Sequence, residues 1–231
     1  MRFVRIIARL DIKGPNLVKG VQLEGLRVLG KPESFARFYY QSGADELFYM
    51  DAVASLYGRN SLLEIVRLTS SEIAIPLCVG GGIRSVDDVR AVLRAGADKV
   101  AINTAAIERP RLIQEVARAF GSSTVVVSIE AIHHGGGRYE AYTNYGRDSS
   151  GVDAFDWARQ AVDLGAGEIM ITSIDREGKG RGFDLELTRR ISDAVPVPVV
   201  AGGGAGTVGH IAEVVENGGA DAVSIASIIH Y

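Results

Sequence analysis

Short apolar runs alternate along the chain with longer segments in which apolar residues recur at helical spacing. The runs are rich in valine and isoleucine and almost continuously hydrophobic, which is typical of parallel strands buried on both faces. The helical segments between them supply the cover that such strands need. The pattern predicts strands at residues 4–10, 46–51, 75–79, 99–102, 124–129, 168–172, 198–201 and 222–225.

Segments between most of these strands place their apolar residues on one helical face. The clearest of them predict helices at residues 86–95, 111–120, 154–164 and 185–195. Eight alternating strand–helix units predict an α/β fold of the (β/α)8, or TIM, barrel type. The chain stops at SIIHY directly after the last expected strand, so we expect a barrel whose last helix is missing from this chain.

Two stretches of the chain have similar sequences, with glycines at matching positions. CVGGGIRSVDDVRAVLRAGADKVAINTAA begins at Cys78, and VAGGGAGTVGHIAEVVENGGADAVSIASI begins at Val200. Aligning their glycines also matches GADE at 43–46 with GAGE at 165–168, and a similar offset takes Asp11 to Glu130. The repeat predicts one barrel domain, residues 1–231, built from duplicated half-barrels at about 1–120 and 121–231.

Composition narrows the class of protein. The chain has 231 residues, 47% of them hydrophobic, which is enough for one well-buried barrel. Its net charge of −3 gives no reason to expect a nucleic-acid partner, and no apolar run is long enough to span a membrane. A lone cysteine, Cys78, indicates a cytoplasmic setting. Neither metal-ligand spacing nor a dinucleotide-binding glycine motif occurs, so we expect no metal and no cofactor.

The duplicated glycine turns are candidates for phosphate binding. Each triple glycine lies between a strand and a helix, where backbone N–H groups can approach an anion closely and a helix N-terminus favours it. A second polar turn follows in each half, Asn103-Thr104 in one and Ala226-Ser227 in the other. The repeat predicts two phosphate sites on opposite sides of the barrel mouth, suited to a substrate with a phosphate at each end. The alternative is that the glycines only make tight turns.

Two carboxylates, Asp11 and Glu130, end strands on opposite sides of the predicted barrel. There they can serve as general acid and general base, although acidic residues at strand ends are often helix caps. Lys19 lies in the expected loop after the first strand, either as a cation above the substrate or as a solvated loop lysine. His133-His134 fit a glycine-rich polar loop better than a ligand pair.

The chain closely resembles the cyclase-subunit family of imidazole glycerol phosphate synthase, the HisF family. The resemblance runs from RIIARLDIK through GADELFYMD, VGGGIRSVDDVRAVLRAGADKVAINTAA and TSIDREGKGRGFDLELT to AGGGAG and SIASIIH. It implies a duplicated barrel that adds ammonia to a bis-phosphorylated formimino-ribulosyl aminoimidazole carboxamide nucleotide. The imidazole ring then closes and the aminoimidazole carboxamide ribotide is released. The implied partner is a separate glutaminase subunit (HisH-like) that supplies the ammonia and forms a heterodimer with the barrel.

The same resemblance implies roles for particular residues. Asp11 and Glu130 would be catalytic, and Arg5, Glu46, Lys99 and Glu168 would form a charged ammonia gate on the face where the glutaminase docks beside Asp98. The substrate and its phosphates would be bound by Lys19, Gly82, Asn103, Thr104, Thr172, Glu177, Gly178, Gly204 and Ser227. A purely structural ring of salt bridges is the alternative for the gate.

Three residues depart from the family pattern. Glu130 and Glu177 stand where the family has aspartate, and Arg9 takes a small-residue position in the first strand. RLDIKGPNLVKGVQLEGLRVLG also resembles a paralogous branch of surface-polysaccharide biosynthesis, whose members pass ammonia to a separate amidotransferase that builds an amidino sugar. A further alternative is the sister sugar-phosphate isomerase, which shares the half-barrel duplication but needs no ammonia.

Overall fold

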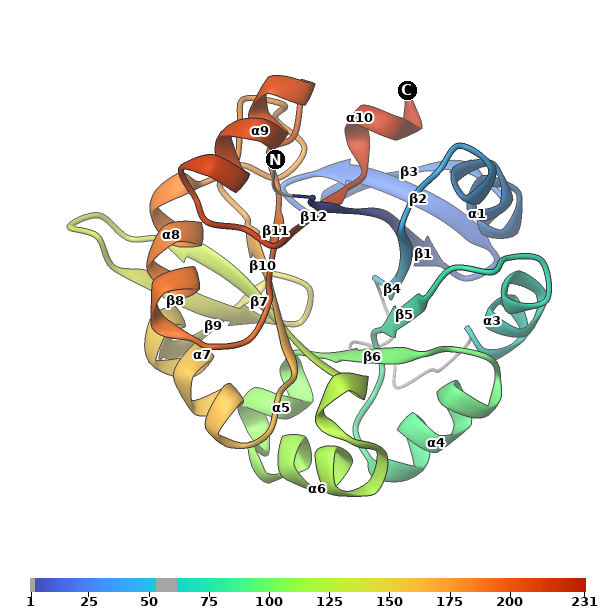
Figure 1. The fold of residues 1–231 in the computed structure, drawn as a ribbon, viewed down its shortest axis with the longest axis horizontal. Coiled ribbons are helices and arrows are strands. Elements are labelled where there is room, and N and C mark those ends of the chain that lie inside the picture. Colours follow the sequence, from blue (N-terminus) through green and yellow to red (C-terminus); the bar gives the residue numbers. More distant parts are fainter. Residues whose placement is uncertain (1–2, 53–61) are drawn as a thin grey trace.

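A closed ring of eight parallel strands forms the centre of the protein, seen end-on in Figure 1. The structure is a computed structural model that describes residues 3–52 and 62–231. Each of these strands pairs with the next, and β12 returns to β1, so the barrel is closed. The strands are β1 (Arg5–Lys13), β4 (Glu46–Asp51), β5 (Leu77–Gly80), β6 (Lys99–Ile102), β7 (Val125–His133), β10 (Glu168–Ser173), β11 (Val199–Gly202) and β12 (Ala222–Ile225). The predicted (β/α)8 barrel is confirmed.

Helices surround the outside of this barrel (Figure 1). They are α1 (Pro32–Gln41), α3 (Leu63–Ser70), α4 (Val86–Arg94), α5 (Thr104–Glu108), α6 (Arg111–Phe120), α7 (Ala154–Asp163), α8 (Leu185–Ala194), α9 (Val208–Glu216) and α10 (Ser227–His230). The four helices predicted from spacing begin at the expected residues. Capping explains several of these starts, because Ser85, Asp153 and Asp184 each accept a hydrogen bond from a backbone N–H in the first turn.

Side chains alternate between the two faces of each barrel strand. Ile7, Phe48 and Met170 point into the barrel and pack on one another. Their neighbours Ala8 and Leu47 point outward and pack under the helices. Because both faces are buried in this way, the strands carry the continuous apolar runs seen in the sequence.

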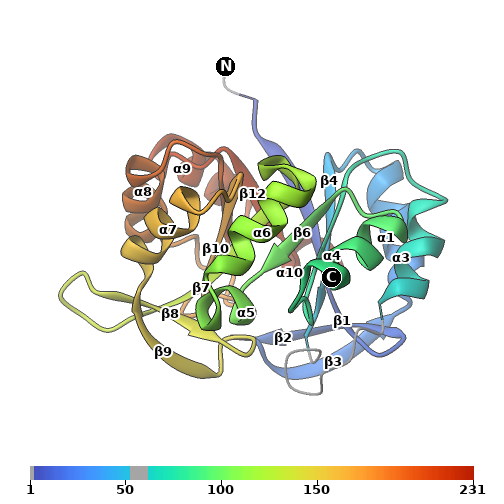
Figure 2. The same ribbon diagram turned by 90° about the horizontal axis from the view of Figure 1, so that it is seen from below.

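Strands β1 and β7 continue beyond the barrel into antiparallel hairpins that the sequence analysis missed. The first hairpin adds β2 (Asn16–Val21) and β3 (Glu24–Gly30), and the second adds β8 (Tyr139–Thr143) and β9 (Asp148–Asp153). Both lie at the end of the barrel opposite the chain's N-terminus (Figure 2). The prediction of a loop after the first strand is therefore wrong, and the HHGGGR segment is the turn between β7 and β8.

The two halves match in backbone conformation. Ser85 before α4 has φ −146° and ψ 163°, and Thr207 before α9 has φ −146° and ψ 162°. Asn103 and Ala226 share a rarer conformation, with φ −123° and ψ −87° against φ −132° and ψ −78°. These pairs are the ones that the repeat aligns, so the agreement supports the predicted duplication, which remains a hypothesis.

Candidate functional site

Asp11 and Glu130 lie at the height where β1 and β7 leave the barrel for their hairpins. Asp11 is level with Met50 of β4 on one side and Val18 of β2 on the other. Glu130 is level with Thr172 of β10 and with the hairpin strand β8. The triple-glycine turns follow the ends of β5 and β11 at this same end of the barrel, so the structure brings the two carboxylates and the glycine turns to one mouth.

Asp11 is a buried, ion-paired carboxylate. Arg9 donates a hydrogen bond through Nε to Oδ1 of Asp11 at 2.8 Å, and Nζ of Lys19 lies 3.9 Å from Oδ2. Burial by itself would raise the pKa of Asp11, but the positive charges of Arg9 and Lys19 outweigh it and hold this pKa below its usual value. Asp11 is therefore ionised throughout the neutral range.

Glu130 is equally buried, but no lysine or arginine of the described residues forms an ion pair with it. Its Oε2 accepts a hydrogen bond from Nδ2 of Asn103 at 3.0 Å. Burial raises the pKa of Glu130 from 4.5 to about 7, with the charge of Arg9 opposing the rise and that of Asp11 adding to it. Two neighbouring carboxyl groups thus differ in protonation near neutral pH, which is the condition for separate acid and base roles.

A cavity of about 240 Å³ adjoins Glu130. Three residues predicted to bind phosphate, Gly82, Asn103 and Thr104, line it. The side chains of the last two are already engaged, because Asn103 bonds Glu130 and Thr104 Oγ1 accepts a hydrogen bond from the backbone N–H of Asn144 at 2.9 Å. A ligand in this cavity would therefore meet backbone groups at the turn, the hydroxyl hydrogen of Thr104 and the side chain of Arg84, while Asn103 orients Glu130.

The second set of predicted phosphate residues lines a separate, much smaller cavity of about 10 Å³. Glu177, Gly178, Gly204 and Ser227 border it, together with Arg9 and Ser224. Thr172 lies outside this lining, although it is buried and its Oγ1 accepts a hydrogen bond from Nη1 of Arg9 at 3.3 Å. The structure thus divides the predicted binding residues into two groups, one for each half of the repeat.

The middle glycine of each triple is required by packing as well as by the turn. Gly81 has φ +93°, and a Cβ there would lie 2.5 Å from the carbonyl oxygen of Asp51. Gly203 has φ +84°, and a Cβ there would lie 2.6 Å from the carbonyl oxygen of Ser173. The structural explanation of these glycines therefore holds whether or not a phosphate binds. The next long helices begin several residues after the turns, α4 at Val86 and α9 at Val208. The glycines therefore do not lie directly at the N-terminus of either helix.

Lys19 and Glu177 form a buried ion pair between the first hairpin and the loop after β10. Lys19 is 3% exposed and lies on β2, so both predictions for it, a cation in a loop and a solvated lysine, place it wrongly. The hairpin carries Lys19 into the mouth, where it neutralises Glu177 and approaches Asp11. Only the pairing of β1 with β2 reveals this position.

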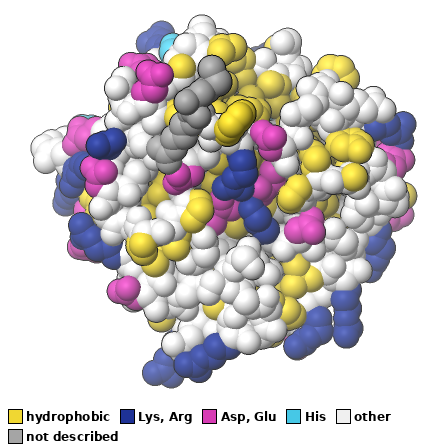
Figure 3. All heavy atoms as spheres, viewed as in Figure 1, with side chains coloured by type: hydrophobic (Ala, Val, Ile, Leu, Met, Phe, Trp, Pro, Cys, Tyr) yellow, Lys and Arg dark blue, Asp and Glu magenta, His cyan; other side chains and the backbone are white. Residues whose placement is uncertain are grey.

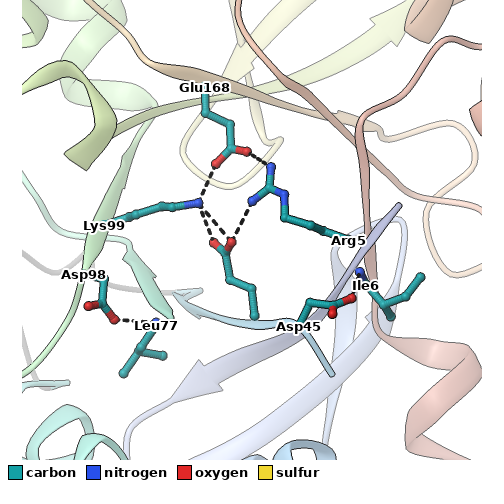
Figure 4. Close-up of polar contacts among 8 residues, drawn as sticks. Arg5, Ile6, Asp45, Leu77, Asp98, Lys99 and Glu168 are labelled. Carbon is teal, nitrogen blue, oxygen red and sulfur yellow. Dashed lines mark hydrogen bonds and ion pairs between the residues drawn. The ribbon is translucent and has the colours of Figure 1, made fainter. Parts of the chain in front are cut away.

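The four predicted gate residues meet at the opposite end of the barrel. Charged side chains gather at the centre of that face in Figure 3, and Figure 4 shows the ring itself. Arg5 pairs with Glu46 at 2.8 Å and with Glu168, and Lys99 pairs with Glu46 at 2.9 Å and with Glu168 at 3.0 Å. Each acid bridges both bases, so the ring closes across four strands. Such complete pairing offsets the cost of burying the charges.

Asp98 lies on the rim beside this ring and has a structural task. Its carboxylate accepts a hydrogen bond from the backbone N–H of Leu77 at 2.9 Å (Figure 4). Asp45 does the same for Ile6 at 2.8 Å, and Asp221 for Val199 at 3.0 Å. A repeated strand-capping role therefore accounts for these aspartates without a partner protein, and docking by Asp98 is an additional hypothesis.

Within residues 3–52 and 62–231, no group of histidine, cysteine or acidic side chains could hold a metal ion. No helix in the same residues is long and apolar enough to cross a membrane. The sequence analysis noted Arg9 only as a departure from the family and overlooked Ser224 at the mouth. The only signal for Arg9 was a charged residue between apolar neighbours on a strand that is otherwise buried.

Comparisons with known proteins agree with this geometry. Residues 5–231 match the model of a family described as histidine biosynthesis protein. A protein of Legionella pneumophila is 61% identical over 206 residues, which covers 89% of this chain and 97% of that protein. Proteins of Myxococcus xanthus (strain DK1622) and Alkaliphilus metalliredigens (strain QYMF) are 51% and 48% identical, covering 98% of this chain and 89% and 90% of their own lengths. All three are named imidazole glycerol phosphate synthase subunit HisF.

Proposed function

The chain belongs to the histidine biosynthesis protein family, and we propose that it acts there as a cyclase subunit of the imidazole glycerol phosphate synthase type. The substrate is a bis-phosphorylated aminoimidazole carboxamide nucleotide, to which ammonia is added. Ring closure and cleavage then give imidazole glycerol phosphate and release the aminoimidazole carboxamide ribotide. Relatives that carry this name at 48–61% identity over most of the chain support the proposal.

The observation that carries the proposal is the unequal protonation of two carboxyl groups at one mouth. Glu130, with its pKa raised to about 7, keeps a proton to donate as the leaving nitrogen departs. Asp11, held ionised by Arg9 and Lys19, stabilises positive charge that develops when ammonia attacks. The glycine turns on either side suit a substrate that is anchored by a phosphate at each end.

A glutaminase subunit is the proposed source of ammonia, docked on the face that carries the charged ring. Lys99 and Arg5 each pair with both Glu46 and Glu168. One side chain can therefore shift slightly and break one ion pair while every charge in the ring keeps another partner. The sister sugar-phosphate isomerase needs no ammonia and hence no such entrance. Co-purification of a glutaminase with the full chain is expected, and its absence would favour the isomerase.

Turnover of the nucleotide substrate with an ammonium salt tests the cyclase proposal directly. We expect product to form, and we expect Asp11→Asn to lower kcat by at least about 100-fold. Glu130→Asp keeps the carboxyl group but shortens the side chain by one methylene, which moves the carboxyl by roughly 1.5 Å. The activity of this variant therefore shows whether the site requires the length of glutamate. No turnover by the native protein combined with turnover by Glu130→Asp would refute the cyclase assignment.

A second candidate function is favoured by one observation, the buried pair between Arg9 and Asp11. The pairing makes Asp11 a weak base, as expected for a barrel that transmits ammonia to a separate amidotransferase without its own ring closure. In that case Asp11→Asn leaves amidotransfer by the partner enzyme unchanged, whereas Lys99→Ala disturbs it. A large loss of amidotransfer from Asp11→Asn would exclude this alternative.

A further inference from the structure

Below the second glycine turn, the guanidinium of Arg9 keeps one nitrogen without a partner. Arg9 is 3% exposed, and the Cζ atom of its guanidinium lies 5.6 Å from the centre of the Phe48 ring. Its Nε bonds Asp11 and its Nη1 bonds Thr172, which leaves Nη2 buried with no hydrogen-bond partner in the part of the chain that the structure describes. A buried charged donor in this condition costs stability unless an acceptor meets it.

Ser224, on the neighbouring strand β12, carries a second buried polar atom of this kind. It is 4% exposed, and its Oγ also lacks a partner among residues 3–52 and 62–231. Arg9 and Ser224 both line the small cavity that Gly178, Gly204 and Ser227 border from above. The enclosed space of about 10 Å³ has room for about one water-sized group, that is, for a single oxygen atom.

The barrel repeat does not itself require these polar groups. Alignment of the two halves matches Ser224 with Ala101, and Arg9 with Ser128. Ala101 borders the larger cavity at the other glycine turn, so a small apolar side chain suffices there. Arg9 comes from the first half and Ser224 from the second, and the aligned residues Ser128 and Ala101 do not supply the same pair at the first turn. The combination therefore indicates a task specific to the second turn.

The surroundings leave Arg9 able to meet an additional acceptor. The only carboxylate in the cavity lining is Glu177, and it is paired with Lys19. Asp11 takes up the Nε side of the guanidinium, and its pairing with Arg9 does not involve Nη2. Guanidinium groups bind tetrahedral oxyanions well because several of their N–H donors can be used at once.

We propose that Arg9 and Ser224 form the floor of an oxyanion site, in which the innermost oxygen of a phosphate monoester is bound by Nη2 of Arg9 and Oγ of Ser224. The loop glycines and Ser227 bind the outer part of the same group. This proposal rests on the proposed function and deepens it, since it assigns one phosphate of the substrate to two named side chains at the second glycine turn. It stands on binding alone and requires no turnover.

Calorimetric titration of the full chain with glycerol 3-phosphate, repeated with inorganic phosphate, provides the test. Ser224→Ala leaves the pair between Arg9 and Asp11 intact and is expected to weaken one binding site by about 3- to 10-fold. Ser128→Ala is the matched control, because Ser128 is also a buried serine whose hydroxyl has no partner among the described residues, but it lies outside the small cavity, at the strand position that aligns with Arg9; no change is expected.

The contribution of the charge is measured against a background that avoids an unpaired aspartate. Arg9→Met combined with Asp11→Asn is compared with Asp11→Asn alone, and the expected loss of affinity at one site is about 10- to 100-fold. Nitrogen-15 spectra of the arginine side chains should show the Arg9 signals moving when glycerol 3-phosphate is added, with Arg9→Lys identifying those signals.

Two results would overturn the proposal. One is binding of glycerol 3-phosphate by Ser224→Ala as tight as that of the native chain. The other is an Arg9 signal that does not respond to the ligand at saturation, which would make Arg9 only the partner of Asp11. Lack of turnover with binding intact would refute the proposed function and leave the oxyanion site standing.

Discussion

Glu130→Gln should stabilise the protein in a pH-dependent way. Folding raises the pKa of this carboxyl from 4.5 to about 7, so the folded protein holds the proton more tightly than the unfolded chain does. The native protein therefore loses stability as the pH rises from about 4.5 to 7, because ionising a buried Glu130 becomes part of the cost of folding. Glutamine avoids this cost and can still accept the hydrogen bond from Asn103.

The size of the effect follows from the pKa change. A difference of about 2.5 pH units, at 1.36 kcal/mol each, corresponds to about 3 kcal/mol above pH 7. For a chain of this length, that is a rise in Tm of about 6–12 °C. Below about pH 4, where the carboxyl is largely protonated in both states, the variant and the native protein should differ little.

Thermal unfolding of both proteins at pH 5, 6, 7 and 8 measures this difference. Asp11→Asn is the control of opposite sign. The pKa of Asp11 is lowered by folding, so its stabilising contribution is present at neutral pH and is lost in acid. A Tm difference between Glu130→Gln and the native protein that stays constant from pH 5 to pH 8 would show that Glu130 does not titrate as the structure indicates.

Asp98→Asn should weaken the complex with a glutaminase by about 3- to 10-fold more than Asp45→Asn does. Both aspartates cap a strand, and only Asp98 is a docking candidate. Equal effects of the two substitutions in a binding titration would leave Asp98 with the capping role alone. Lys19→Met should lower the free energy of unfolding by about 3–5 kcal/mol by leaving Glu177 buried and unpaired, and adding Glu177→Gln should restore most of it in denaturant titrations. If the double variant is no more stable than the single one, the pair does not act as a unit. Gly203→Ala should cost at least about 1–3 kcal/mol, measured in the same way, because φ of +84° and a carbonyl oxygen at 2.6 Å both oppose a Cβ; a neutral result would mean that the turn relaxes.

The sequence alone determined the barrel, its eight strands and the starts of four helices. Buried parallel strands are apolar throughout and amphipathic helices repeat every 3.6 residues, so both leave a local pattern that needs no long-range information. The ring of charges was also accessible, because Glu46, Lys99 and Glu168 each begin a strand and parallel strands all begin at one end of a barrel. The repeat also placed Gly82, Asn103 and Thr104 together and Gly178, Gly204 and Ser227 together, as the two cavities do, and their binding of phosphate stays a prediction.

Only the tertiary structure decided what lies at the mouth. That β1 and β7 run on into hairpins depends on antiparallel pairing with segments whose sequences read as polar loops, and this pairing carries Lys19 into the interior. The protonation of Asp11 and Glu130 differs because Arg9 and Lys19 lie next to one and not the other. Such charge pairing is set by distances across a closed barrel. The order of residues along a strand fixes which face a side chain takes, and it leaves open which partner that side chain meets.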